Sequence, residues 1–98
     1  MAVPRSANTG LVYILRSGRN GRFYIGHTTN LPQRLAAHNR GAVRATRHLL
    51  PWSLVYVEDH ASASDARKRE WYLKRLKSRR FLENLISKSQ GLPAAGAR

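Results

Sequence analysis

Two short apolar runs near the start of the chain are separated by a polar stretch. The first run, Leu11–Arg16, is almost entirely apolar, as in a strand that is covered on both faces. The second run, Arg22–Gly26, contains aromatic and β-branched residues, which favour strands. The residues between them, 17–21, are rich in Ser, Gly and Asn, which are typical of turns. The pattern therefore predicts a β-hairpin.

Two tyrosines, Tyr13 and Tyr24, lie near the middle of these strands. Whether their side chains meet depends on the register of the hairpin. A tight turn at Gly18–Arg19 would place them directly opposite each other, with both side chains on one face of the sheet. A turn at Asn20–Gly21 would instead leave Tyr13 without this partner. A shift of one residue would send the two side chains to opposite faces. We expect the turn at Gly18–Arg19.

A helix is predicted directly after the hairpin, over residues 31–40. Asn30 is a favourable N-cap residue, and Gly41 is suited to end the helix. Leu31 and Leu35 lie one turn apart and are expected to face the core. The first helix should therefore pack on the sheet.

The second half of the chain predicts one more strand and then a longer helix. Large apolar residues occupy every second position from Trp52 to Tyr56, which indicates a strand over residues 52–58. One face of this strand would carry Trp52, Leu54 and Tyr56. A helix should begin near Ser62 or Ser64, both competent caps, and continue to about residue 78. Its apolar stripe at helical spacing would comprise Ala66, Tyr72, Leu73 and Leu76.

Together these elements predict a small α+β fold. A short third helix, Phe81–Ile86, completes the order β-β-α-β-α-α, with a three-stranded antiparallel sheet flanked by helices. A chain of 98 residues suggests one domain, which we expect to span residues 10–86. Residues 1–9 are expected to be a disordered N-terminus, and residues 87–98 a flexible tail.

The charge of the chain narrows the classes of partner. Lys and Arg number 18 against 5 Asp and Glu, which gives a net charge of +13. A small domain this basic favours a polyanion, and nucleic acid is the leading candidate. A membrane surface is not favoured, because no predicted helix combines a basic face with a broad apolar one. The absence of cysteine excludes disulfides and thiolate metal sites. With neither a signal peptide nor a transmembrane run, we expect a cytoplasmic, nucleoid-associated protein.

An ordered set of residues matches a known family. Tyr13 lies eleven residues before Tyr24-Ile25-Gly26, and Arg34 and His38 follow at helical i, i+4 spacing. Glu70 lies among basic residues on the second predicted long helix. This set resembles the GIY-YIG endonuclease family, and in particular its small single-domain bacterial members. The resemblance covers residues 11–86, nearly all of the expected domain.

Some positions depart from the family pattern. The glycine of the first motif is absent, because Leu11-Val12 precedes Tyr13 and Gly10 lies one residue too early. The member joined to excision repair has a lysine directly after its second motif, whereas this chain has His27. The chain also shows no second DNA-binding domain, so the resemblance does not indicate how a target is selected.

The resemblance implies hydrolysis of one phosphodiester bond in DNA, in branched or damaged structures, with one divalent metal ion, Mg²⁺ or Mn²⁺. Glu70 would hold the metal, and Arg34 would clamp the phosphate. Tyr13 or Tyr24 would act as general base, and His38 would relay a proton or contact phosphate. DNA is favoured over RNA. Further contacts to the DNA backbone are expected from His27, Arg44, Arg47, Arg67, Arg69 and Lys74.

Each of these residues also has a purely structural explanation. The tyrosines would simply pack together, and Arg34 would be a solvated helix residue. His38 would be an ordinary histidine at a helix end, favoured by the helix dipole. Glu70 would form a surface ion pair with Lys74. The corresponding alternative function is a non-catalytic nucleic-acid-binding module on the same fold, and a ribosome-associated basic protein is a third option. His48 and His60 are expected to be surface residues.

Overall fold

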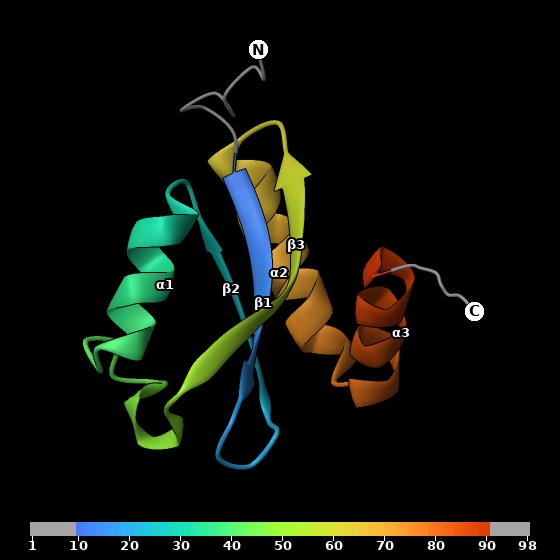
Figure 1. Ribbon diagram of the computed structural model, residues 1–98. Coiled ribbons are helices and arrows are strands. Elements are labelled where there is room, and N and C mark those ends of the chain that lie inside the picture. Colours follow the sequence, from blue (N-terminus) through green and yellow to red (C-terminus); the bar gives the residue numbers. More distant parts are fainter. Residues whose placement is uncertain (1–9, 91–98) are drawn as a thin grey trace.

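The computed structural model describes residues 10–90, which form one three-stranded antiparallel sheet and three α-helices (Figure 1). Strand β1 (Gly10–Ser17) lies at the centre of the sheet, between β2 (Phe23–Thr28) and β3 (Trp52–His60). The helices are α1 (Leu31–Asn39), α2 (Ala63–Leu76) and α3 (Arg79–Gln90), and a short 3₁₀ helix, η1 (Arg47–Leu49), precedes β3. The predicted α+β class and element order are confirmed.

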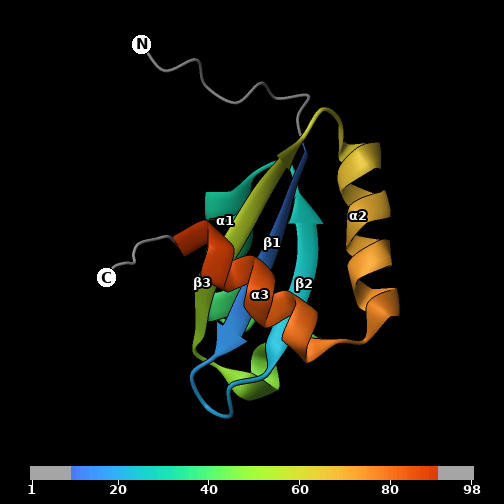
Figure 2. The same cartoon turned by 90° about the vertical axis from the view of Figure 1, so that its right-hand side faces the viewer.

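Helices cover both faces of the sheet. Helix α1 lies on one face, whereas α2 packs over β1 and β2 on the other face and α3 packs against β3 (Figures 1 and 2). Successive residues of a strand point to opposite faces, so β1 supplies side chains to both layers. Val12 and Ile14 pack with Ala66 and Leu73 of α2. On the α1 face, Tyr13 and Leu15 pack with Trp52, Leu31 and Leu35. This explains the nearly continuous apolar run of the first strand.

The hairpin register differs from the prediction by two residues. Tyr13 pairs with Gly26, and Leu15 pairs with Tyr24. The turn is wider than expected, because Ser17 N donates to the carbonyl of Arg22 at 2.8 Å and residues 18–21 form the loop. The hydroxyl oxygen of Ser17 accepts from two backbone N–H groups of this loop, and Gly21 has a φ of 78°. The predicted turn at Gly18–Arg19 is therefore wrong. The two tyrosines still share one face, because a shift of two residues preserves the alternation.

A bulge in β3 overturns the predicted single face of Trp52, Leu54 and Tyr56. Leu15 pairs with Leu54 and Ile14 pairs with Tyr56, so the register between β1 and β3 shifts by one residue at Val55. Trp52 packs on the α1 side of the sheet, whereas Tyr56 packs on the α2 side. The strand also continues two residues past its predicted end, to His60.

The ends of α1 and α2 agree closely with the prediction. Asn30 Oδ1 accepts from Gln33 N at the start of α1, and Gly41, which follows the C-cap residue, has a φ of 79°. Ser62 is the cap of α2, and its hydroxyl accepts from the backbone N–H of Asp65. Within the predicted stripe of α2, Ala66 and Leu73 are buried, but Tyr72 and Leu76 are partly exposed. The stripe that packs on the sheet is thus narrower than expected.

Helix α3 is longer at both ends than the predicted helix Phe81–Ile86. Residues 87–90, which were expected to belong to a flexible tail, are helical. The predicted disordered N-terminus, residues 1–9, and the rest of the predicted tail, residues 91–98, lie outside the described residues. No helix within residues 10–90 combines the length and hydropathy needed to cross a membrane.

Candidate active site

A chain of buried polar groups lies between the sheet and α1. The Tyr13 hydroxyl lies 2.8 Å from Nε2 of His38, and Nδ1 of His38 lies 2.8 Å from Oγ1 of Thr46. All three residues are buried. The Thr46 hydroxyl donates to the carbonyl of Val43, so its oxygen accepts from Nδ1–H of His38. Nε2 of His38 is then the acceptor for the Tyr13 hydroxyl.

The charge state of His38 supports this assignment. Burial, and to a lesser degree the nearby charge of Arg34, lower the pKa of His38 to about 4. His38 is therefore neutral at pH 7, with one ring nitrogen that donates and one that accepts. A neutral acceptor does not suit a direct contact with phosphate, but it does suit a proton relay.

The loop that supplies Thr46 is anchored by Trp52 at the start of β3. Nε1 of Trp52 donates to the carbonyl of Thr46 at 2.8 Å. The side chain of Asn39, at the end of α1, pairs with both backbone groups of Trp52, at 2.8 and 2.9 Å. Helix α1, this loop and β3 are thereby held together, which fixes the position of His38. Sequence reasoning gave neither Thr46 nor Asn39 a role.

Arg34, one turn before His38 on α1, interacts with the phenol of Tyr13. The contact with Tyr13 raises the pKa of Arg34, so the guanidinium stays charged. Burial raises the pKa of Tyr13, and Arg34 lowers it by less. Tyr13 is therefore a protonated phenol at neutral pH. The predicted shared face of Arg34 and His38 is confirmed, since both approach Tyr13.

Tyr24 links the two sides of the site. Its ring centroid lies 5.0 Å from that of His38 and 6.4 Å from that of Tyr13. On its other side, Nζ of Lys74 from α2 lies 5.7 Å from the ring centroid. Unlike Tyr13, Tyr24 is only half-buried. Its hydroxyl is consequently the more accessible of the two phenols.

Glu70 of α2 accepts hydrogen bonds from His27 Nδ1 on β2 and from Lys74 Nζ. The predicted ion pair with Lys74 is thus present, together with a histidine that sequence reasoning had assigned to a DNA contact. Burial raises the pKa of Glu70, but the hydrogen bonds from Lys74 and His27 outweigh it and lower the pKa below its usual range. Glu70 is therefore ionised at neutral pH.

The donor atoms around Glu70 decide which metal ion could bind there. Among the described residues, no three His, Cys, Asp or Glu side chains lie close enough together to form a metal cluster. Glu70 supplies one ionised carboxylate, which is a hard oxygen ligand. This donor set fits Mg²⁺ or Mn²⁺ that keeps several water ligands, and it does not fit a closed zinc site.

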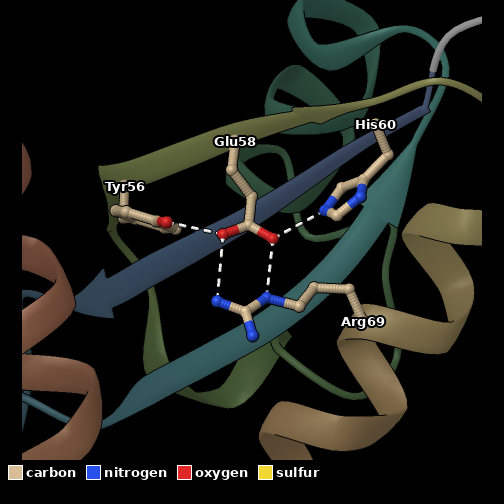
Figure 3. Close-up of polar contacts among 4 residues, drawn as sticks. All are labelled: Tyr56, Glu58, His60 and Arg69. Carbon is tan, nitrogen blue, oxygen red and sulfur yellow. Dashed lines mark hydrogen bonds and ion pairs between the residues drawn. The ribbon is translucent and has the colours of Figure 1, made fainter.

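The basic residues expected to contact DNA fall into two groups. Arg44, Arg47 and Arg67 are exposed, as a phosphate contact requires. Arg69 is not free, because its Nε donates to Glu58 at 2.8 Å and its Nη2 donates to the same carboxylate at 3.4 Å (Figure 3). Its charge is therefore already balanced by Glu58 on β3, so the expected DNA contact would require this ion pair to open.

Glu58 also accepts from the Tyr56 hydroxyl and from Nε2 of His60 (Figure 3). His60 was expected to be a surface residue, but it is held in this cluster and its side chain is only 23% exposed. Burial raises the pKa of Glu58, but hydrogen bonds led by that of Arg69 lower it overall. The cluster joins α2 to β3, and so fixes the helix that carries Glu70.

Comparisons with known proteins found a matching family model and several relatives. A family model described as the GIY-YIG catalytic domain matches residues 9–84, which include every residue of the candidate site. A UPF0213 protein of Streptococcus pneumoniae is 41% identical over 80 residues, which covers 81% of this chain and 79% of the relative. The structure-specific endonuclease subunit SLX1 of Chaetomium globosum is 48% identical over 69 residues. That match covers 63% of this chain but only 21% of the longer fungal protein.

A solved structure is also similar. The solution NMR structure of the UPF0213 protein BH0048 from Bacillus halodurans is 34% identical in sequence, with a TM-score of 0.51. The match covers 80% of this chain and 82% of that protein. The similarity therefore extends over most of the sheet and helices that hold the site.

Proposed function

The chain belongs to the GIY-YIG family of nuclease domains, and on this premise we propose that it is a metal-dependent endonuclease that hydrolyses a phosphodiester bond in DNA. One observation carries the proposal: the residues of the family motifs converge at the edge of β2. Tyr13 donates to His38, Tyr24 stacks edge-on against His38, and Lys74 connects Tyr24 with Glu70. An unrelated basic protein has no reason to gather these groups.

Arg34 is the residue assigned to bind the scissile phosphate. Its guanidinium remains charged at all physiological pH values and can form two parallel hydrogen bonds to phosphate oxygens. The same group would offset the negative charge that develops in the transition state. The neighbouring phenol of Tyr13 raises the pKa of Arg34, so the guanidinium is charged before substrate binds.

The two tyrosines have different roles in this proposal. Tyr13 is almost fully enclosed and holds its proton, so we assign it to positioning through its hydrogen bond with His38. Tyr24 is half-buried and can reach a bound phosphate and the attacking water. We therefore assign Tyr24 as the general base.

Glu70 is assigned as the protein ligand of the metal ion. When bound there, Mg²⁺ or Mn²⁺ would supply a Lewis acid for the phosphate oxygens and the leaving oxygen. His27 and Lys74 keep Glu70 ionised and oriented in the absence of metal. Metal binding would have to displace or share these hydrogen bonds.

The proposal is tested by incubating labelled duplex, flap, fork and single-stranded DNA with the protein, with and without Mg²⁺ or Mn²⁺. We expect cleavage of at least one DNA structure only when the metal is present. Glu70→Gln, which keeps the shape of the side chain but removes its charge, should abolish cleavage and leave DNA binding equal or slightly tighter. Metal-independent cleavage, or a fully active Glu70→Gln variant, would overturn the assignment of Glu70.

A non-catalytic DNA-binding module is the second candidate. It is favoured by the hydrogen bonds from His27 and Lys74, which already engage both carboxylate oxygens of Glu70. This alternative predicts tight, salt-dependent DNA binding without cleavage of any substrate in the panel. The same experiment therefore separates the two functions.

A further inference from the structure

The outward face of α2 carries an exposed tryptophan. Trp71 is 60% exposed, which is the highest exposed fraction among the large hydrophobic side chains of the described residues. The other tryptophan of the chain, Trp52, is only 5% exposed. Burying a tryptophan is strongly favourable, so a side chain left in water on a rigid helix is available for binding.

Basic side chains surround Trp71 at helical spacing. Arg75, one turn after it, lies over the indole ring with its guanidinium carbon 4.6 Å from the ring centroid. Arg67 and Lys68, one turn before it, line a shallow hollow of about 290 Å³ together with Trp71. The ring is thus covered by Arg75 on the C-terminal side, while the hollow leaves it open on the N-terminal side.

The position of Trp71 around the helix connects it with the candidate active site. Consecutive helical residues are about 100° apart, so Trp71 follows Glu70 around the axis, and Lys74 and Arg67 lie between them. Arg69, which is bound to Glu58, lies on the opposite flank. A single strand of DNA that passes Glu70 and Lys74 can therefore cross Arg67 and reach Trp71.

Resting on the proposed nuclease function, we propose that Trp71 is a stacking platform for an unpaired base of the DNA substrate, with Arg67, Lys68 and Arg75 contacting the adjacent phosphates. Aromatic side chains bind single strands in this way because every base has an exposed π-face once it is unpaired. In a continuous duplex, both faces of each base are already stacked. The platform therefore selects DNA that has a single-stranded segment next to the cleavage site.

Charge complementarity identifies the occupant. Three cations adjoin Trp71 on this face, in a chain whose net charge is +13. Such a surface attracts a polyanion and repels most basic partners. An aromatic ring that adjoins three cations matches the alternation of base and phosphate along a single strand.

The test is a binding experiment in EDTA, so that no cleavage takes place. Flap DNA should quench tryptophan fluorescence, and the quenching should come from Trp71 because Trp52 is buried. Trp71→Ala should weaken the binding of flap DNA about tenfold and change the affinity for blunt duplex by less than about twofold. Trp71→Phe should retain part of the preference, because it keeps an aromatic ring.

Tyr72→Ala is the matched control. Tyr72 is the next residue, is 47% exposed, and also has an arginine over its ring, with Arg69 5.7 Å from the centroid. It lies on the flank of α2 that faces away from Glu70, so this variant should keep the wild-type preference for flap DNA. Circular dichroism melts would confirm that each variant is folded.

The outcomes separate the platform from the nuclease. Equal losses of affinity for flap and duplex DNA in Trp71→Ala, or the absence of quenching by flap DNA, would overturn the platform even if the wild-type protein cleaves DNA. Conversely, a wild-type protein that cleaves nothing but loses flap binding through Trp71→Ala would remove the nuclease and retain the platform.

Discussion

Tyr13 and Gly26 are cross-strand partners, and the tyrosine ring lies directly against the glycine backbone. A β-carbon on Gly26 would lie 2.5 Å from the Tyr13 hydroxyl oxygen and 2.6 Å from the ring carbon that carries it. Only glycine leaves the room that the phenol needs to reach His38. The glycine of Tyr24-Ile25-Gly26 thus serves the first tyrosine, and the hairpin register makes this possible.

We predict that Gly26→Ala destabilises the fold by roughly 1–3 kcal/mol, because an added methyl group overpacks a site where strand and ring cannot easily separate. The displaced phenol should also lose its hydrogen bond to His38 and slow any cleavage. Urea unfolding measures the first effect and single-turnover kinetics the second. Wild-type stability and activity would show that the Tyr13 ring moves at no cost.

The pH dependence of stability should report on His38. Its pKa is about 4 in the folded state against 6.5 for the free side chain, so the unfolded state binds the proton more readily. The stability contributed by neutral His38 is therefore complete above pH 6.5 and is lost as the pH falls toward 4. The full loss is on the order of 3 kcal/mol.

Urea unfolding at several pH values between 7.5 and 4 tests this prediction. His38→Gln should remove this part of the pH dependence, although it lowers stability at pH 7. His48→Gln, which changes an exposed histidine on η1, is the control and should behave as the wild type. A wild-type stability that is constant between pH 6.5 and 5 would contradict the neutral, buried state of His38.

Local signals in the sequence were sufficient for the helix ends and the shared tyrosine face. The cap at Asn30 and the stop at Gly41 depend only on residues within one turn, so the boundaries of α1 could be predicted. The shared face of Tyr13 and Tyr24 follows from the two-residue alternation of strands, which the error in register preserved. The turn itself was missed because the Ser17 side chain stabilises a wider loop.

Contacts that depend on three-dimensional packing could not be predicted in the same way. Thr46 lies in an irregular loop, and only the anchoring of that loop by Trp52 brings it to His38. The pair of Glu58 and Arg69 depends on the bulge at Val55, because the side chains of Tyr56 and Glu58 that follow it lie on the α2 side of the sheet. No spacing in the sequence indicates that bulge.

The different environments of Arg67 and Arg69 lead to opposite predictions for two neighbouring residues. Arg67→Ala should lower the slope of log affinity against log salt by about one for flap DNA, because an exposed phosphate contact is lost. Stability should hardly change. Arg69→Ala should leave this slope unchanged and reduce the free energy of unfolding by roughly 1–3 kcal/mol, because Glu58 loses a charged partner.

Fluorescence anisotropy over a salt series and thermal melts on both variants separate these effects. A reduced salt slope in Arg69→Ala would mean that the ion pair with Glu58 opens on DNA. In that case Arg69 would be a phosphate contact after all, as its sequence position first indicated.

The last prediction concerns the two phenols. Tyr24→Phe should slow cleavage by roughly 10²-fold, since the general base is lost. Its stability should change by at most about 1 kcal/mol, because Tyr24 is only half-buried and water can replace the partners of its hydroxyl. Tyr13→Phe should cost about 1–3 kcal/mol of stability, because Nε2 of His38 is then buried without a donor.

Single-turnover rates on a cleaved substrate, measured beside urea unfolding, compare the two variants directly. The combination of His38→Leu with Tyr13→Phe should recover part of the stability lost in Tyr13→Phe, because both polar partners are then removed. Adding His38→Leu to Tyr24→Phe should not restore the cleavage rate. If Tyr13→Phe is normally stable but inactive and Tyr24→Phe is fully active, the buried phenol is the base, and the roles assigned from exposure are reversed.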